Sequence, residues 1–505
     1  MSTRSESGRA SSSPRHERSA LVAALVFIGL VVAVVGSLGA PLITVVAADY
    51  HASLAAAQWT LTVPLLSGAV STPILSRLGS GPRRRAVVIW TLTIVAAGGA
   101  LTALPVPFPV LSIGRAAQGV GLGLTALMMA VAREHLSERR SARAIALLSV
   151  ASTAGVGVGY PLAGLLTDFA GIRAAYALGF AVATAALIVA VVILPSAPPR
   201  PPIRVDVRGA VLLTCALMGL LLVISQTGVW HHHASLAAGV LVISMMLLVG
   251  WVVLEARTEN PLVDVRALRH PAVASANLAM VAGGIAMYLL LSLVTRYVQT
   301  PAATGYGFGL STFQAGLVLV PFSLFGFVAG RLIPRLHGRF RGRTLLAGSA
   351  GVVLVAFVAF AISRDRLVDS VVAISVLGLG VGAFSAAMPA VILAATPPAD
   401  TAGAMGVNQV VRSVGFSIGS ALGGLILAGH TTEVFPDDSG YSVAAWVGAA
   451  VTVATLLSVA AFRYSDADRW PCSRPSGSPV TLRASRCLRR PRRSNSPPTV
   501  STGGS

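Results

Sequence analysis

Long stretches without a charged residue recur along the whole chain, and they constrain its fold more than any other feature. Ala20 to Ala48, Ala86 to Gly114 and Ser370 to Ala399 are examples. A helix needs about 20 apolar residues to cross a bilayer core of roughly 30 Å. Lipid offers the backbone no hydrogen-bond partner, so only helices and closed barrels cross it, and these stretches lack the alternating pattern of barrel strands. The sequence therefore predicts an all-α membrane protein.

Cutting the longer stretches at their Pro-rich, Gly-rich and His-rich turns predicts fourteen transmembrane helices. They span residues 20–46, 54–76, 85–104, 109–132, 143–167, 173–194, 207–226, 235–255, 271–298, 311–334, 343–363, 369–396, 402–429 and 440–463. Charged residues make up only 11% of the chain, whereas a soluble globular protein carries about 25%. This difference excludes a water-soluble globule.

A short basic turn with an Arg-Leu pair occurs at the same place in two blocks of six spans. It reads Ser76-Arg-Leu-Gly-Ser-Gly after 54–76 and Gly330-Arg-Leu-Ile-Pro-Arg after 311–334. Transporters are commonly built from such repeats, with the substrate site at their interface. We expect two six-helix bundles plus two inserted linker helices. The expected domains are a disordered cytoplasmic tail (1–19), the first bundle (20–195), the linker spans (206–256), the second bundle (270–463) and a disordered basic cytoplasmic tail (464–505).

The basic residues indicate the orientation of the chain in the membrane. All 38 are Arg; 32 fall on one side of the predicted spans and three on the other. Positive charge near span ends stays on the cytoplasmic side, so we expect a multi-pass protein of the cell membrane with both termini in the cytoplasm. The lipid bilayer is the expected partner of this charge. Nucleic acid is not, because no aromatic residues are interleaved with the Arg residues.

Two predicted spans carry glycine-rich motifs. The span at 109–132 contains Arg115-Ala-Ala-Gln-Gly-Val-Gly121, and the span at 143–167 contains Gly155-Val-Gly-Val-Gly-Tyr-Pro-Leu-Ala-Gly164. With these motifs the chain resembles the major facilitator superfamily, specifically its fourteen-span drug:proton antiporter branch, over about residues 20–463. The first motif fits the family's Arg-x-x-Gln-Gly-x-Gly in full. The second fits in part, because Tyr160 stands where the family has Gly before Pro161.

The resemblance implies roles for both motifs. Arg115 and Gln118 are expected to take part in transport and coupling; the alternative for Arg115 is a structural anchor that binds carbonyls of the span at 20–46. The second motif implies a hinge or seal between the bundles, and its alternative is plain close packing of helices. The expected gating residues are Gly155, Gly159, Pro161, Gly164 and Ser80.

The departures from the family concern acidic residues. Val32 occupies the position where the branch usually has a carboxylate, and Ser80 and Pro334 replace the Asp of the two basic turns. No carboxylate is predicted at mid-membrane. Proton coupling is therefore expected to use Asp49 or Asp168, at the outer ends of their spans, or the ionisation of the solute itself. The missing charge at Ser80 is expected to bias the resting state toward inward-facing.

Arg115, Arg296 and Arg412 lie inside predicted spans and away from their cytoplasmic ends. Burying a cation at a span centre costs roughly 2.5–3.5 kcal/mol on insertion scales and usually marks function. Arg412 follows Asn408 and Gln409 on one helix face, which indicates a polar strip along a cavity or an interhelical hydrogen bond. Arg296 either lines the cavity or extends to the membrane surface. The residues predicted to line the substrate cavity are Trp59, Asn277, Arg296, Asn408, Gln409 and Arg412.

Other chemistry is not indicated. The three Cys have no metal-ligand spacing, and the His231 to His233 run has no acidic or Cys neighbours, so neither a metal nor a cofactor is expected. No acid–base constellation of an enzyme is present.

The predicted function is secondary active export of hydrophobic or amphipathic small molecules by alternating access, coupled to protons, by a monomer. The alternatives are a facilitator or anion-preferring carrier without tight proton coupling, and a membrane sensor or scaffold that transports nothing. Electropositive Arg residues in the cavity favour neutral or anionic solutes over cations.

Overall fold

The computed structural model describes residues 14–38, 42–52, 54–196, 206–225, 234–258, 261, 265–266, 271–336, 339–394, 396, 401–431 and 435–461. These residues belong to one compact unit, Met1–Asp468. They are helical throughout, apart from turns and one isolated β-bridge between Thr431 and Pro436. The all-α class is therefore confirmed. The predicted tail at 464–505 and the His231 to His233 run lie outside the described residues.

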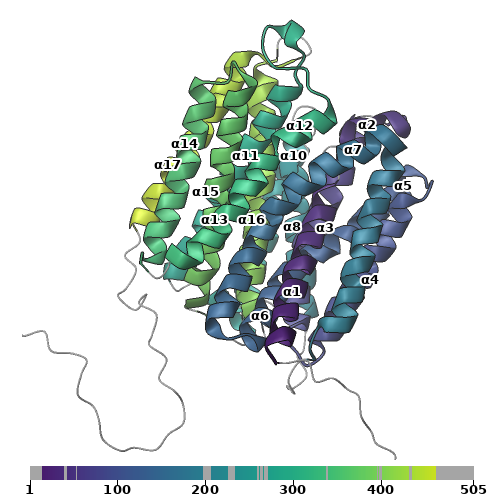
Figure 1. The fold of residues 1–505 in the computed structure, drawn as a ribbon, viewed down its shortest axis with the longest axis vertical. Helices are drawn as coiled ribbons and strands as arrows, with labels where there is room; N and C mark the ends of the chain where they lie inside the picture. The colour runs from purple at the N-terminus through teal and green to yellow at the C-terminus, as the bar shows by residue number, and fades with distance from the viewer. Residues whose placement is uncertain are drawn as a thin grey trace, which may run out of the picture. The chain divides into compact units, whose positions relative to one another are not determined.

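The first group of helices ends at Ile193 (Figure 1). Its members are α1 (Pro14–Ser37), α2 (Ile43–Asp49), α3 (Leu54–Leu78), α4 (Arg84–Ala103), α5 (Phe108–Val120), the 3-10 turn η2 (Gly121–Gly123), α6 (Leu124–His135) and α7 (Glu138–Ile193). Helix α1 begins within the range 1–19 that was predicted as a tail, and its first residue is a proline, which suits the first turn of a helix.

The second group follows two intervening helices, α8 (Val207–Ser225) and α10 (Ala234–Arg257). Its members are α11 (Pro271–Gln299), the 3-10 turn η4 (Ala302–Thr304), α12 (Thr312–Val318), α13 (Val320–Leu336), α14 (Gly342–Ile362), α15 (Leu367–Ala394), α16 (Thr401–Gly429) and α17 (Asp438–Ala461). Helices α8 and α10 pack against each other, and α8 also contacts α3 and α16, one helix from each group.

Eleven helical segments of the described chain are long and apolar enough to cross a membrane. Helices α3 and α8 are not among them. The predicted spans at 143–167 and 173–194 lie in the single element α7, whose only non-helical residue is Gly171, with φ 77°. Glycine adopts this left-handed conformation without a steric penalty, which allows a sharp change of direction without a loop. Fourteen crossings remain a prediction.

The two groups share a continuous core. The largest cluster of buried apolar side chains includes Leu25 and Leu127 from the first group and Met280 and Phe384 from the second. Helix α7 packs on α12, α13 and α15, and α16 packs on α3 and α6. The two groups therefore meet along α3, α6 and α7 on one side and α12, α13, α15 and α16 on the other.

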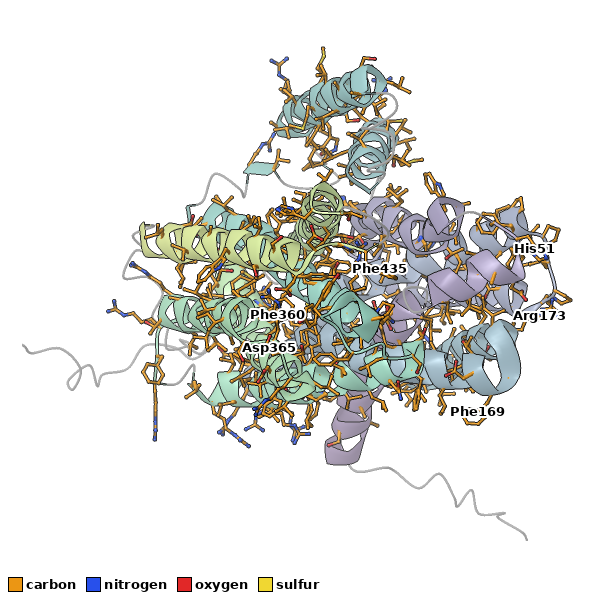
Figure 2. All side chains as sticks on the ribbon, turned by 90° about the horizontal axis from the view of Figure 1, so that it is seen from above. His51, Phe169, Arg173, Phe360, Asp365 and Phe435 are labelled. Atoms are coloured by element: carbon orange, nitrogen blue, oxygen red, sulfur yellow. The ribbon has the colours of Figure 1, made fainter. Side chains whose placement is uncertain are left out.

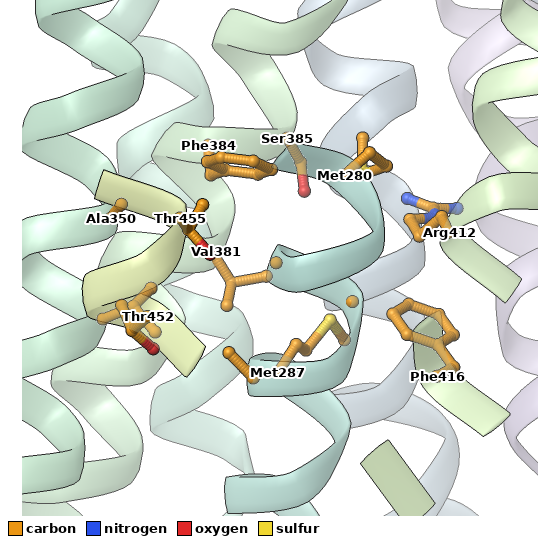
Figure 3. Close-up of a pocket in the computed structure, with 14 residues that line it drawn as sticks. Met280, Met287, Ala350, Val381, Phe384, Ser385, Arg412, Phe416, Thr452 and Thr455 are labelled. Carbon is orange, nitrogen blue, oxygen red and sulfur yellow. The ribbon is translucent and has the colours of Figure 1, made fainter. Parts of the chain in front are cut away.

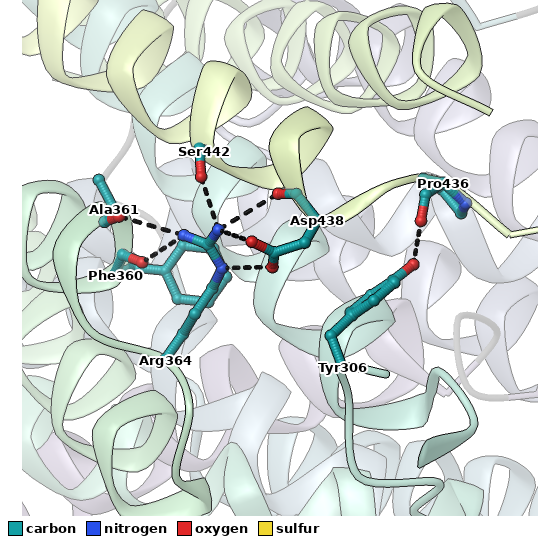
Figure 4. Close-up of polar contacts among 7 residues, drawn as sticks. All are labelled: Tyr306, Phe360, Ala361, Arg364, Pro436, Asp438 and Ser442. Carbon is teal, nitrogen blue, oxygen red and sulfur yellow. Dashed lines mark hydrogen bonds and ion pairs between the residues drawn. The ribbon is translucent and has the colours of Figure 1, made fainter. Parts of the chain in front are cut away.

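A polar clamp joins the loop after α14 to the start of α17 (Figure 4). The Arg364 guanidinium donates to the Asp438 carboxylate, with Nε 2.8 Å from Oδ1, and also to the Ser442 hydroxyl. Burial lowers the pKa of Arg364, but the hydrogen bonds and charge of Asp438 outweigh burial and raise it above its ordinary value. In the loop that follows α11, the Tyr306 hydroxyl donates to the Pro436 carbonyl. These contacts fix one end of the second group.

The same end of the molecule carries exposed residues of both groups (Figure 2). His51, Phe169 and Arg173 belong to the first group, and Asp365 and Phe435 to the second. The Phe169 side chain is 84% exposed, next to Asp168. By the Arg distribution this end is the one expected outside the cell.

Candidate functional site

A small cavity lies between the two groups, and polar side chains of α16 line it. Asn408, Gln409 and Arg412 face it together with Thr125 of α6 and Ser149 of α7. Its volume is about 10 Å³, which is close to the space that one water needs. The other lining residues are Ala126, Met129, Met280, Ser385, Pro389 and Met405. The predicted polar strip of α16 thus lies at an interface to which both groups contribute.

The strip also makes hydrogen bonds to its neighbours. Nη2 of Arg412 donates to Oε1 of Gln409 at 2.7 Å, and Nδ2 of Asn408 donates to Oδ1 of Asn277 on α11 at 3.3 Å. Asn408 is 4% exposed and Arg412 8% exposed. All three residues line the cavity. Asn408 also bonds across helices, whereas Gln409 and Arg412 bond to each other within α16.

A second cavity adjoins the first but lies inside the second group (Figure 3). Helices α11, α14, α15, α16 and α17 line it, and its volume is about 20 Å³. Met280, Ser385 and Arg412 line both cavities. Neither set of lining residues contains Asp or Glu. Arg412 thus stands at the junction of two compartments whose walls carry no carboxylate.

Arg115 is fully buried among helices of the first group. Its Nε donates to the Thr60 carbonyl at 2.9 Å, and its Nη1 donates to the Val35 carbonyl at 3.3 Å and to Oε1 of Gln118 at 2.6 Å. Gln118 continues the network to the hydroxyl of Thr102 at 3.2 Å. Arg115 lines neither cavity, and its contact with α1 is the anchor that the sequence analysis gave as the alternative.

Four other predicted site residues also lie away from both cavities. Arg296 is exposed near the end of α11, because its position on the helix turns it away from the core. Trp59 packs on an apolar cluster that includes residues of α8 and α10. Asp49 and Asp168 are exposed. The structure therefore brings together Asn277, Asn408, Gln409 and Arg412 and leaves these four elsewhere.

The glycines of α7 face two different partners. An added Cβ at Gly155 would lie 2.4 Å from the Ala33 side chain, and one at Gly159 would lie 2.2 Å from the Ser37 hydroxyl, so both glycines pack on α1 within the first group. A Cβ at Gly164 would instead lie 2.9 Å from the backbone of Phe313 in α12. Gly155 and Gly159 therefore pack within the first group, whereas Gly164 is in close contact with the second group.

The two residues at the family's Gly-Pro position also contact the second group. Gly316 of α12 allows the backbones of Tyr160 and Pro161 to approach, since a Cβ there would lie 3.0 Å from the Pro161 nitrogen. The Tyr160 side chain packs against the apolar cluster of the second group. The tyrosine that departs from the family motif thus fills space at the interface of the two groups.

Sequence reasoning missed a contact between the groups at the end of α6. The Arg133 guanidinium donates to the Leu393 carbonyl at 3.0 Å, the Thr396 carbonyl at 2.9 Å and the Thr401 hydroxyl at 3.0 Å. It joins α6 to the end of α15 and the start of α16. The sequence showed Arg133 only as one of many basic residues at span ends, and nothing local indicated a partner about 260 residues away.

The neighbouring basic turn forms its own ion pair. Arg84, at the start of α4, pairs with Glu134 of α6, and its Nε donates to the Gly79 carbonyl at 2.6 Å. Ser80, where the family has Asp, donates to the Ser76 carbonyl at 2.8 Å. Ser76 in turn lies against α16, because a Cβ at Gly406 would be 2.4 Å from its hydroxyl. The turn that contains Ser80 is thus close to the second group.

Comparisons with known proteins agree with this architecture. A model of the Major Facilitator Superfamily matches residues 25–368. The tetracenomycin C resistance and export protein of Streptomyces glaucescens is 27% identical over 401 residues, which cover 77% of this chain and 72% of the relative. The cephamycin export protein CmcT of Amycolatopsis lactamdurans is 27% identical over 392 residues, which cover 75% of this chain and 78% of the relative.

A solved structure shows the same fold at lower identity. The human organic anion transporter MFSD10 matches with a TM-score of 0.62 and 15% sequence identity, covering 88% of this chain and 99% of that chain. At this identity the likeness concerns the fold alone. The family match, the export relatives and the apolar helices together describe a multi-pass membrane carrier, not an enzyme. The chain belongs to the Major Facilitator Superfamily.

Proposed function

We propose that this protein is a fourteen-span exporter of hydrophobic or amphipathic small molecules that works by alternating access and is driven by the proton gradient. The observation that carries the proposal is the cavity between the two groups, lined by Asn408, Gln409 and Arg412. A polar strip in an otherwise apolar interface is what a carrier needs to hold a solute at mid-membrane. The two relatives named above are export proteins.

The membrane arrangement belongs to the same proposal. The two groups are the moving bundles, at 20–195 and 270–463, and α8 and α10 are the linker pair between them. The protein lies in the cell membrane as a monomer, with both termini in the cytoplasm. The 32 Arg residues on that side support this orientation.

The proposal includes a route for proton coupling. Asp49 and Asp168 are exposed at the other side, where they can exchange protons with water. Arg115 and Gln118 of α5 bond to α1, α3 and α4, so they act on coupling by keeping the shape of the first bundle. Arg412 supplies positive charge to the solute cavity, which favours neutral or anionic solutes over cations.

Transport by the purified full chain in proteoliposomes, with and without a pH gradient, tests the proposal. The solutes are a neutral dye, an acidic dye and the permanent cation ethidium. We expect the gradient to drive accumulation of the neutral and acidic dyes, and ethidium to be carried least. Equal uptake with and without the gradient identifies a facilitator and refutes proton coupling. Ethidium transport that exceeds the other two and survives Arg412→Ala refutes the charge preference.

A further inference from the structure

The cavity inside the second group has an apolar wall. Met280, Met287, Val353, Val381, Phe384 and Phe416 line it, together with Ala350 of α14. Two threonines of α17 also line it, but the Thr452 and Thr455 hydroxyls already donate to carbonyls of their own helix, at 2.8 and 2.9 Å. The compartment is therefore suited to apolar or aromatic groups, and its polar end is at Arg412 and Ser385.

Arg412 connects this compartment to the cavity between the groups. Its guanidinium carbon lies 5.6 Å from the centre of the Phe416 ring, and its Nη2 bonds Gln409. Figure 3 shows Arg412 and Phe416 at the same side of the compartment, with Met280 beside Arg412. A solute that binds Arg412 through a charged group could thus extend its apolar part past Phe416 into the second group.

We infer that the compartment receives the aromatic part of an amphipathic organic acid whose carboxylate binds Arg412. The inference rests on the proposed export function and names its solute class. Guanidinium and carboxylate form strong paired hydrogen bonds, and burial of ring carbons favours binding in proportion to their area. The volume of about 20 Å³ is too small for a ring, so the compartment must widen. Met280 and Met287 are the flexible side chains that allow it.

Calorimetric binding to the full chain in lipid nanodiscs tests the ligand class. The probes are benzoate, 2-naphthoate and 2-anthracenecarboxylate, with their neutral amides as matched controls and empty nanodiscs for lipid partitioning. We expect Kd to fall about fivefold to tenfold with each added ring. We also expect each acid to bind at least about tenfold more tightly than its amide, and Arg412→Gln to abolish that difference while keeping the dependence on ring number.

Two variants test the compartment from opposite directions. Ala350→Leu fills it, so the gain per added ring should disappear while benzoate still binds. Val381→Ala enlarges it, so 2-anthracenecarboxylate should bind several-fold more tightly. Val294→Ala is the matched control, because Val294 is also buried, on α11, but lines neither cavity. Melting curves confirm that each variant is folded, and Val381→Ala decides the test if Ala350→Leu does not fold.

The results that overturn the inference differ from those that overturn export. If Ala350→Leu is folded and its Kd still falls with each added ring, the aromatic part does not bind in this compartment. Acids that bind no better than their amides also refute the inference. Vesicles that export neutral compounds while the acids fail to bind overturn only the solute class. Vesicles that transport nothing, combined with the expected binding pattern, overturn the export function and leave the compartment standing.

Discussion

At the scale of single residues, burial separates three Arg residues that look alike in the sequence. Arg115 is fully buried and bonds carbonyls of α1 and α3. Arg412 is 8% exposed and lines two cavities, whereas Arg296 is exposed. A buried cation is tolerated only where the protein replaces its lost water. The three side chains therefore lie in different surroundings: between packed helices, in a cavity wall and at the surface.

Arg115→Ala should destabilise the first group of helices. The change removes charge-assisted hydrogen bonds, each worth about 1.5–3 kcal/mol, and it leaves a cavity. We therefore expect the free energy of unfolding to fall by about 3 kcal/mol or more. Arg296→Ala, at an exposed position, should change it by less than about 0.5 kcal/mol. Thermal unfolding in nanodiscs measures both. Arg115→Lys keeps the charge but cannot reach all three acceptors, so full stability in that variant would contradict the anchor.

The double variant Asp49→Asn, Asp168→Asn tests the proton route. Asn does not gain or lose a proton as the pH changes, so pH-driven transport of a neutral solute should be abolished while binding of the solute is kept. Proteoliposomes with an imposed pH gradient measure this, and the two single variants show whether one carboxylate is enough. Full pH-driven transport of a neutral solute by the double variant would rule out this route.

At the scale of helices, one contact joins the predicted cytoplasmic ends of the two groups. Arg133 of α6 donates to the Leu393 carbonyl in the last turn of α15 and to the Thr396 carbonyl just beyond it. The last carbonyls of a helix lack partners within the helix and carry partial negative charge. Glu134, its neighbour, pairs with Arg84 within the first group. The chain thus has a link between groups that does not need the Asp missing at Ser80.

Removing the Arg133 link should open the predicted cytoplasmic side. Arg133→Ala deletes charge-assisted hydrogen bonds that exist only while the groups touch, so about tenfold more inward-open protein is expected. The readout is the labelling rate of Ser76→Cys, a buried position that faces Gly406, after replacement of the three native cysteines. Arg139→Ala, an exposed Arg nearby, is the matched control. Labelling that is equal in both variants would show that Arg133 does not hold this side closed.

Ser80→Asp should act in the opposite direction. It restores the negative charge that the family has in this turn, near the second group. A partly exposed ion pair is worth about 0–1 kcal/mol, so the labelling rate of Ser76→Cys should fall by up to about fivefold. Ser80→Asn is the control of equal size without charge. If Asp and Asn have the same effect, the charge at this position plays no part in closure.

At the scale of the whole molecule, the glycines of α7 distinguish stability within a group from movement between groups. Gly155 packs on α1, whereas Gly164 packs on the backbone of α12. A backbone neighbour cannot rotate away as a side chain can, so an added methyl group at Gly164 must move a helix of the other group.

Gly164→Ala should therefore slow transport at least about tenfold with a small effect on the melting temperature. Gly155→Ala should lower the melting temperature more, because it crowds α7 and α1, two helices of the same group. Gly348→Ala is the control, since no atom lies within 4 Å of the added Cβ. It should change transport by less than about twofold and slightly favour the helix. Equal transport rates for Gly164→Ala and Gly348→Ala would show that this contact has no part in the transport cycle.

The sequence alone determined the all-α class and the bounds of several helices. The predicted spans 85–104, 271–298 and 343–363 correspond to Arg84–Ala103, Pro271–Gln299 and Gly342–Ile362. This agreement has a local cause: an apolar run in lipid must satisfy its own backbone, so charged residues and turn residues at its ends mark where the helix stops. The strip of Asn408, Gln409 and Arg412 also follows from local sequence, because helical spacing places these side chains on one face.

Only the tertiary structure decided which of these side chains meet. Contacts between distant parts of the chain decide four features. These are the partners of Arg133, the burial of Arg115, the different neighbours of the α7 glycines and the second cavity. Hydropathy cannot distinguish the faces of a helix that is apolar all round. Which face is buried, and against which helix, is set by where small residues let backbones approach, and that depends on the packing of all the helices together.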